Sequence, residues 1–283
     1  MSIKNLFTRK CTHCGQSAGL FKKVHPDCER KHNEAKQKIM DMIIACFHEN
    51  EDFYYLEPII KDIARENFID ETMLSRISAF VYKKIADAVI DQGHWSDEMD
   101  NRLFDLSIAT DLDTEYLFAW GTSAKVNKAQ IIFKLENGEI PYNAGDLTLE
   151  GILFQKGEGL IYSFWGANLY QQVTRTQYRG GHAGFSMKVA KGLYFRTGGF
   201  RGEPVHTNEM KLVDMGNVVV TDKNLYFKSI EKSLRIPLTK IISLDPYEDG
   251  LGIHTDGASA RPMTIQNVDG WFMYNLISLL VRK

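Results

Sequence analysis

The residues best suited to chemistry in this chain lie close together near its N-terminus. Cysteines occupy positions 11, 14 and 28, and His25 precedes the last of them by three residues. The spacing C-x2-C-x10-H-x2-C places two pairs of donors on two tight turns, which brings four ligands to the corners of a tetrahedron around zinc. The pattern predicts one structural Zn2+ bound by Cys11, Cys14, His25 and Cys28.

Two neighbouring histidines, His13 and His32, are alternative ligands that can replace His25. Four protein ligands leave no position for a water molecule, which favours a structural role over a catalytic one. With Gly15 after the second cysteine, the motif resembles a zinc-ribbon or treble-clef knuckle. Unliganded cytosolic thiols are the alternative interpretation.

Motifs of known enzyme classes are missing from the sequence. It contains no G-x-S-x-G elbow, P-loop, H-E-x-x-H helix or kinase signature, so we expect a non-enzymatic protein with no catalytic residues. A histidine relay is the enzymatic possibility left open, built from His182, His206 or His254 with Asp214, Asp245 or Asp256.

Basic residues recur in a later, strand-like region of the chain. Alternate positions of a strand share one face, so these residues can gather into a patch for phosphate groups or an acidic partner. A solvated sheet face is the alternative. The candidate residues are Arg175, Arg179, Lys188, Lys191, Arg196 and Arg201.

The elements that must position these residues begin with helices. Apolar residues at helical spacing predict helices over 33–47, 56–68, 71–92, 97–109 and 114–137, with Cys46 on the buried stripe of the first. Residues 41–120 carry 6 Lys and Arg against 18 Asp and Glu, whereas residues 1–40 carry 9 against 3. A basic zinc module therefore precedes an acidic helical domain.

Part of this domain resembles a known bacterial family. The stretch IDQGHWSDEMDNRLFDLSIATDLD, from Ile90 to Asp113, resembles a helical hairpin of the TerB-type tellurite-resistance domains. Met99 stands where that pattern usually has an acid, and an acidic solvated face is the plainer interpretation. The resemblance implies a helical fold here.

After about residue 150 the apolar residues no longer recur at helical spacing but at every second position. Short strands separated by turns are predicted, among them 159–165 and 168–178, and 206–214 and 217–220. The segment GNVVVTDKNLYFKS predicts a hairpin, and a helix over 269–281 closes the chain, with Trp271, Phe272 and Leu276 on one face.

This order, together with G-x-x-x-x-T-x-x-x-L-Y-F from Gly216 to Phe227, resembles the bacterial PH-like and GRAM-like families. The resemblance covers roughly residues 150–283 and implies a β-barrel or sandwich with a closing helix. It also implies binding of peptides or lipids.

The predicted fold class is an α+β multidomain protein. Its parts are a zinc knuckle (1–32), an acidic all-α domain (33–137), a linker (138–149) and a PH-like β domain (150–283). An apolar content of 44% suffices for packed cores. No apolar run approaches the roughly 20 residues that span a bilayer, and the N-terminus lacks the apolar stretch of a secretory signal, so we expect a cytoplasmic location.

These features favour an adaptor that binds another protein through its helical and PH-like domains. The alternative is a nucleic-acid-binding protein that uses the basic zinc module and the basic strand face. Anionic lipid is a third, less favoured partner, and the oligomeric state is left open.

Overall fold

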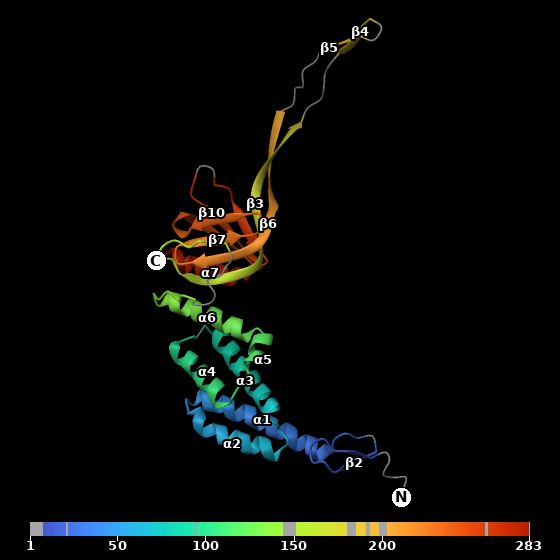
Figure 1. The fold of residues 1–283 in the computed structure, drawn as a ribbon, viewed down its shortest axis with the longest axis vertical. Coiled ribbons are helices and arrows are strands. Elements are labelled where there is room, and N and C mark those ends of the chain that lie inside the picture. Colours follow the sequence, from blue (N-terminus) through green and yellow to red (C-terminus); the bar gives the residue numbers. More distant parts are fainter. Residues whose placement is uncertain are drawn as a thin grey trace. The chain divides into compact units, whose positions relative to one another are not determined.

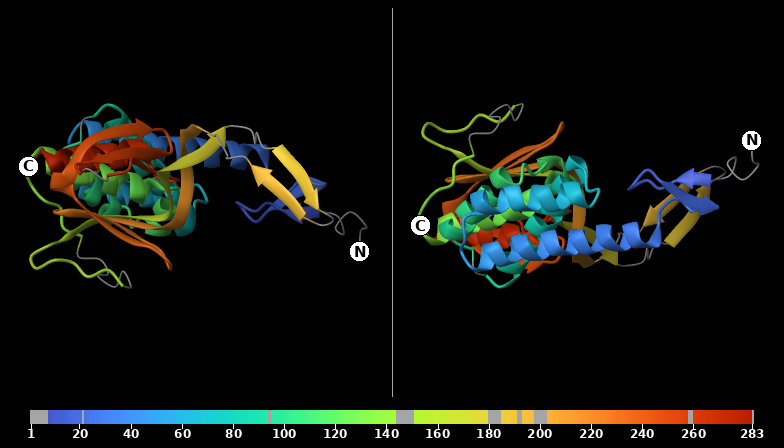
Figure 2. Two further views of the ribbon diagram at one scale, coloured as in Figure 1. Left: turned by 90° about the horizontal axis from the view of Figure 1, so that it is seen from above. Right: turned by 90° about the horizontal axis from the view of Figure 1, so that it is seen from below.

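The computed structural model describes residues 8–20, 22–93, 95–143, 151–179, 185–190, 193–197, 203–257 and 260–282. Side chains are described for these residues except Thr8, Leu20 and 174–208. The chain forms two compact units, 1–133 and 134–283 (Figures 1 and 2). No helix in the described part has the length and apolar character needed to cross a membrane.

The first unit combines a small β-hairpin with helices. Side-chain caps set several helix starts: Asp70 accepts the N–H of Met73, and Ser96 accepts that of Met99. Gly93 follows the third helix with a φ of +69°, the left-handed conformation that glycine commonly adopts just after a helix end. The elements are β1 (Thr8–Lys10), β2 (Ser17–Leu20), α1 (Pro26–His48), α2 (Phe53–Glu66), α3 (Glu71–Asp91), α4 (Asp97–Ala109), α5 (Thr114–Ala119) and α6 (Thr122–Glu136).

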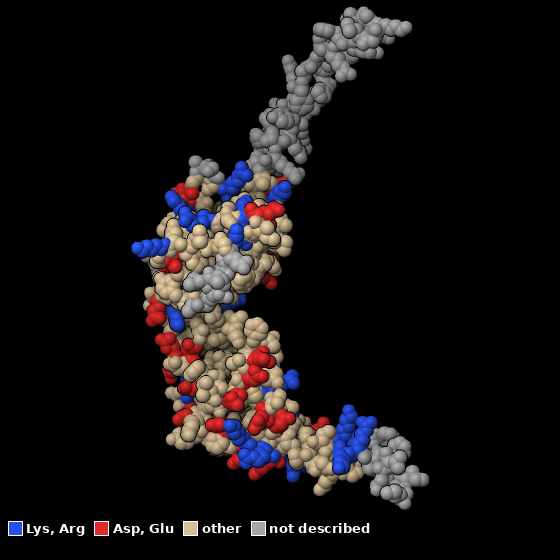
Figure 3. Space-filling model, in the orientation of Figure 1, with Lys and Arg blue, Asp and Glu red and all other residues tan. Residues whose placement is uncertain are grey.

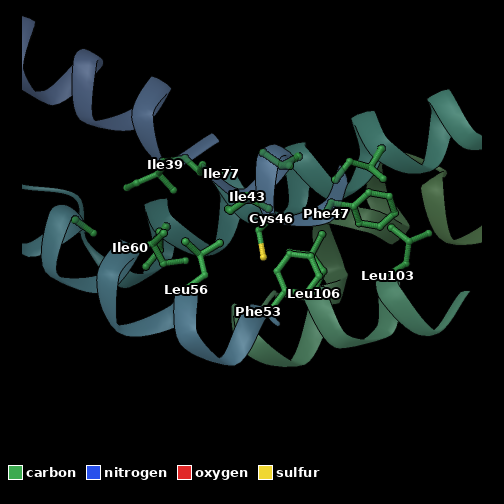
Figure 4. Packing of buried hydrophobic residues seen from close by; sticks show 14 of the residues in the cluster. Ile39, Ile43, Cys46, Phe47, Phe53, Leu56, Ile60, Ile77, Leu103 and Leu106 are labelled. Atoms are coloured by element: carbon green, nitrogen blue, oxygen red, sulfur yellow. The ribbon is translucent and has the colours of Figure 1, made fainter. Parts of the chain in front are cut away.

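The core of this unit lies between α1, α2, α3 and α4 (Figure 4). Cys46 is only 3% exposed and packs with aliphatic and aromatic side chains, which confirms its prediction as a core residue. Ile39, Ile43 and Ile60 are fully buried in the same cluster. The apolar stripe predicted for the first helix therefore faces the core.

Two helix predictions need correction. The first helix begins at Pro26, well before residue 33, because proline fits the first turn of a helix. The segment 114–137 forms two helices, α5 and α6, separated at Gly121, whose φ of +71° ends the first of them.

The second unit is a mixed structure of one large sheet, a separate two-stranded ribbon and a closing helix. The sheet has seven strands, all antiparallel, in the order β8-β7-β6-β3-β11-β10-β9. This order and the closing helix are consistent with the PH-like expectation. The sheet strands are β3 (Leu160–Arg179), β6 (Glu203–Thr221), β7 (Asn224–Lys228), β8 (Ser233–Pro237), β9 (Ile241–Tyr247), β10 (Gly250–Thr255) and β11 (Met263–Gln266); the ribbon pairs β4 (Phe185–Ala190) with β5 (Leu193–Thr197), and the helix is α7 (Gly270–Val281).

Strands predicted as separate are continuous. β3 joins 159–165 to 168–178, and β6 joins 206–214 to 217–220. Gly166 has a φ of +69° where the β3–β6 register shifts. The glycine makes a β-bulge rather than the predicted turn, because pairing on both sides of it holds the strand direction.

The predicted hairpin and the closing helix are both present. Val220 pairs with Leu225 across the turn, and Asp269 caps α7 by accepting the N–H of Phe272. The buried face of α7 is Phe272, Met273, Leu276, Ile277 and Leu280. Trp271, which the sequence places on one face with Phe272 and Leu276, is 67% exposed, so the buried stripe is rotated away from it.

The carboxylate of Glu158 holds the loop before β3 against β7. It accepts hydrogen bonds from Asn224 Nδ2 at 2.8 Å, from Tyr226 OH at 2.8 Å and from the Gln155 N–H at 2.6 Å. Burial disfavours its ionised form, but the hydrogen bonds, those of Thr221 and Asn224 foremost, lower the pKa of Glu158 below 4.5. The charged form of Glu158 therefore stabilises the second unit.

We predict that the second unit loses stability as the pH falls below 4.5, the ordinary pKa of glutamate. The folded state binds the Glu158 proton less tightly than the unfolded state, so the stabilisation is present above that pH and is lost below it. Glu158→Gln should cost about 2 kcal/mol at pH 7 and flatten the profile. Urea unfolding followed by NMR of β7 amides checks this, with exposed Glu248→Gln as the control; equal profiles for Glu158→Gln and wild type would contradict it.

Charge is distributed unevenly over the first unit. On the face drawn in Figure 3, Asp and Glu side chains are frequent over its helices, and Lys and Arg gather beside the N-terminal hairpin. Several acids are paired: Lys125 Nζ lies 2.8 Å from Asp87 Oδ1 and 3.2 Å from Asp91 Oδ1, which ties α6 to α3. Asp87 and Asp91 therefore link these two helices through Lys125.

Candidate metal centre

All four predicted metal ligands come together in the structure. The ligand atoms of Cys11, Cys14, His25 and Cys28 lie within 4.8 Å of one another. Cys11 is buried, and the other three are half-buried. Within the part of the chain that the structure describes, no second group of three or more His, Cys, Asp and Glu side chains converges in this way.

Two local structures position the ligands. Cys11 and Cys14 bracket the turn between β1 and β2, where the Gly15 N–H donates to the Cys11 carbonyl at 2.9 Å. Gly15 has a φ of +71°, a backbone conformation that glycine adopts without strain. His25 is the N-cap of α1 and Cys28 lies in its first turn, so the second pair stands at a helix start.

The ring of His25 is oriented by a backbone group. Its Nε2 donates to the carbonyl oxygen of Ser17 at 2.8 Å, and a carbonyl can only accept. Nε2 therefore carries a hydrogen, and Nδ1 is left facing the sulfurs, 3.3 Å from Cys14 Sγ and 3.7 Å from Cys28 Sγ. A ligand histidine in proteins is commonly fixed through its second nitrogen in this way.

These distances fit zinc. Usual Zn–S and Zn–N bond lengths give a tetrahedral N–S separation of about 3.5 Å. The measured separations of 3.3 and 3.7 Å lie on either side of that value. Three sulfurs and one imidazole nitrogen are also a donor set typical of structural zinc, which would join the β1–β2 turn to α1.

The thiols differ in how readily they ionise. Burial acts to raise the pKa of Cys11, but backbone N–H groups of Cys14, His25 and His13 outweigh it and lower this pKa to about 6. Burial and hydrogen bonds with the thiols of Cys14 and Cys11 raise the pKa of Cys28 to about 11. Ionising Cys28 beside Cys11 is thus unfavourable without a cation, which a metal ion supplies.

The two competing histidines lie outside the cluster. His32 is buried on α1, and its Nδ1 is 2.9 Å from the carbonyl oxygen of Asn67. The His13 ring stacks on the His32 ring, with centroids 4.4 Å apart. The geometry therefore favours His25 as the fourth ligand.

The six predicted basic-patch residues are only partly placed. Arg175 and Arg179 lie on β3, opposite Thr207 and Glu203 of β6. An acid thus stands across from one of the two arginines. Lys188 is on β4 and Arg196 on β5, while Lys191 and Arg201 lie outside the described residues. Arg175 and Arg179 thus lie on the large sheet, whereas Lys188 and Arg196 lie on the separate β4–β5 ribbon. The side chains of these four residues are not described, so the patch stays a prediction.

Of the pairs predicted for a histidine relay, the structure describes one in contact. His254 Nε2 lies 2.8 Å from Asp245 Oδ2, on neighbouring strands β10 and β9. Asp245 is exposed, with 52% of its side-chain surface accessible. His182 lies outside the described residues, and the side chain of His206 is not described. An exposed histidine–carboxylate pair by itself is a surface interaction.

A groove that the sequence patterns did not predict lies between β9 and α7. Pro246 was an available signal, because a proline inside a strand-like run marks an edge strand. The groove encloses about 190 Å3. We call it the β9–α7 groove; it is lined by Ile241, Ile242, Ser243 and Leu244 of β9 and by Tyr274, Ser278, Val281 and Arg282 at α7.

Comparisons with known proteins give little help with function. No protein-family model matches the sequence, and the search of curated proteins finds no match. Among solved structures, a crystal structure of the linker-DH/PH domains of p115-RhoGEF shares 10% identity, covering 93% of this chain and 71% of that chain at a TM-score of 0.22. A crystal structure of an N-terminally truncated form of the same domains also shares 10% identity. It covers 92% of this chain and 72% of that chain at a TM-score of 0.22. This likeness is too weak to support a conclusion about fold or function.

Proposed function

We propose that this chain is a non-enzymatic interaction protein that binds an extended segment of a protein partner along β9. A structural zinc ion at Cys11, Cys14, His25 and Cys28 would hold its N-terminal module. The observation that carries the proposal is the position of β9 at the edge of the sheet beside the β9–α7 groove.

The edge of β9 offers backbone hydrogen-bonding groups. β9 pairs with β10 on one side, and no other described strand pairs with it. Such an edge can receive an added strand from a partner, whose main chain then supplies the affinity. Pro246 interrupts the series of N–H donors, so the segment before it is the better platform.

The groove would select side chains of the added strand. Ile242 is 69% exposed, and Leu244 two residues on is half-buried. Val281 adds apolar surface at the end of α7, and Arg282 adds a positive charge there. The partner segment should therefore carry apolar residues at alternate positions, with an acidic residue near Arg282.

We predict that peptides selected on the full chain from a random library will bind with micromolar affinity and will carry alternating apolar residues. Ile242→Lys should lower the affinity of these peptides at least tenfold, or by about 1.4 kcal/mol, because a lysine charge would be buried under the bound peptide. The matched control is Ile230→Lys, since Ile230 is 102% exposed and lies in the β7–β8 turn. Fluorescence anisotropy measures both; equal losses, or none, would contradict the β9 site.

The nucleic-acid alternative is favoured by charge: residues 174–204 contain six Lys and Arg and one Glu. It makes a different prediction. Binding to duplex DNA or RNA would weaken by roughly tenfold or more between 50 and 200 mM salt, because phosphate contacts release counterions. Anisotropy titrations at the two salt concentrations test it, and undetectable binding at the lower one would eliminate this function.

A further inference from the structure

The loop that carries two of the proposed zinc ligands also contacts the helices of the same unit. His13 lies between Cys11 and Cys14. Its ring stacks on His32 with centroids 4.4 Å apart, and on Phe68 with centroids 5.7 Å apart and planes 22° apart. His32 belongs to α1 and Phe68 to the connection between α2 and α3.

On the helical side of this contact, His32 is buried and anchored by a hydrogen bond. His32 is 7% exposed and bonds through Nδ1 to the carbonyl oxygen of Asn67, the C-cap of α2. Phe68 follows with a φ of +60°. A bulky side chain in this left-handed region needs support from its surroundings, and the His13 ring is part of that support.

The α2–α3 connection forms one wall of a cleft. Ile69 and Asp70 directly follow Phe68 and line a cavity of about 600 Å3, with Lys61 of α2 and Asp111 beyond α4 among the other lining residues. Asp70 is also the N-cap of α3. A change in the position of Phe68 would thus reach the start of α3 and the cleft wall.

We propose that His13 is a positioning residue that couples metal loading to the α2–α3 connection. Bound metal fixes the Cys11–Cys14 loop, the loop holds the His13 ring against His32 and Phe68, and the stack holds the connection. The inference rests on the metal occupancy of the proposed function and is independent of the proposed partner site.

Hydrogen exchange of the full chain tests the coupling. Peptides covering residues 64–74 are followed in zinc-loaded and chelator-treated protein. Chelation should speed their exchange about fivefold or more in the wild type, and less than about twofold in His13→Ala. Thr12→Ala is the matched control, since it changes the same loop at an exposed residue and should behave as the wild type.

A second variant removes the other ring. Phe68→Asn suits the left-handed backbone and deletes the aromatic contact, so it should also lose the response to chelation. All variants should keep about one zinc per chain by elemental analysis.

Several results would overturn the coupling. An undiminished response in His13→Ala, or a wild-type response confined to residues 8–25, would show that the stack transmits nothing. Loss of zinc in His13→Ala would make His13 a ligand instead. Wild-type protein without zinc would overturn the metal assignment as well, and the metal content identifies that case.

Discussion

Purified protein should contain about one zinc ion per chain, and the Cys11→Ser and Cys28→Ser variants less than about a tenth of that amount. Each cysteine supplies one of four converging donors, and Cys28 also fixes the site to the first turn of α1. A serine hydroxyl is a poor zinc ligand, so three donors would remain. Elemental analysis of dialysed protein gives the stoichiometry directly.

The consequence for folding is equally large. Structural zinc sites supply folding free energy, so a chelator should expose residues 8–25 to proteolysis while α1 to α4 remain uncleaved. Cys46→Ser is the matched control, because Cys46 is a core thiol outside the cluster and its loss should leave the zinc content unchanged. Zinc retained in Cys11→Ser, or absent from the wild type, would contradict the site.

Arg102→Ala should destabilise the first unit by about 3 kcal/mol. The guanidinium of Arg102 joins α4 to the end of α1: it donates to the carbonyl oxygens of Glu51 at 2.6 Å and Cys46 at 2.7 Å. It also lies 4.6 Å from the centre of the Phe53 ring. Alanine would leave partly buried carbonyls without these charged donors and would remove the cation–π contact.

Urea unfolding followed by circular dichroism at the helical band measures this effect. Arg102→Lys keeps the charge but has one donor group in place of the planar fork, so it should recover only part of the stability. Arg65→Ala is the control, because Arg65 makes an exposed pair with Asp62 and should have little effect. Equal stability of Arg102→Ala and the wild type would show that the carbonyls are satisfied without Arg102.

Local features of both units were readable from the sequence because their causes lie within a few residues. The helices predicted over 71–92 and 97–109 follow from apolar residues at helical spacing, and they are present as α3 and α4. The hairpin around Asp222 and Lys223 follows from two strand-forming runs beside a short turn. The ligand set followed from cysteine and histidine spacing, since two tight turns suffice to bring such donors together.

The choice among histidines needed the tertiary structure. His13, His25 and His32 are all within reach of the cysteines along the chain. Only the fold shows that the His25 ring is turned by the Ser17 carbonyl, whereas His32 bonds to Asn67 from α2. A side chain's second hydrogen-bond partner is distant in sequence, so spacing alone does not reveal it.

The order of the strands in the sheet decided where the candidate partner site lies. The sequence itself determined a helical part, a strand-rich part, a closing helix and the three cysteines of the proposed metal site. Pairing of β3 with β11 in the folded sheet is what places β9 at an edge and β10 inside, and pairing on both sides of Gly166 keeps β3 continuous. The partners of β3 are far away along the chain: residues of β11 lie 92 to 98 positions from theirs, and Gly216 lies 49 positions from Ala167. Local preferences carry no information over such separations, so only the tertiary structure reveals the β9–α7 groove.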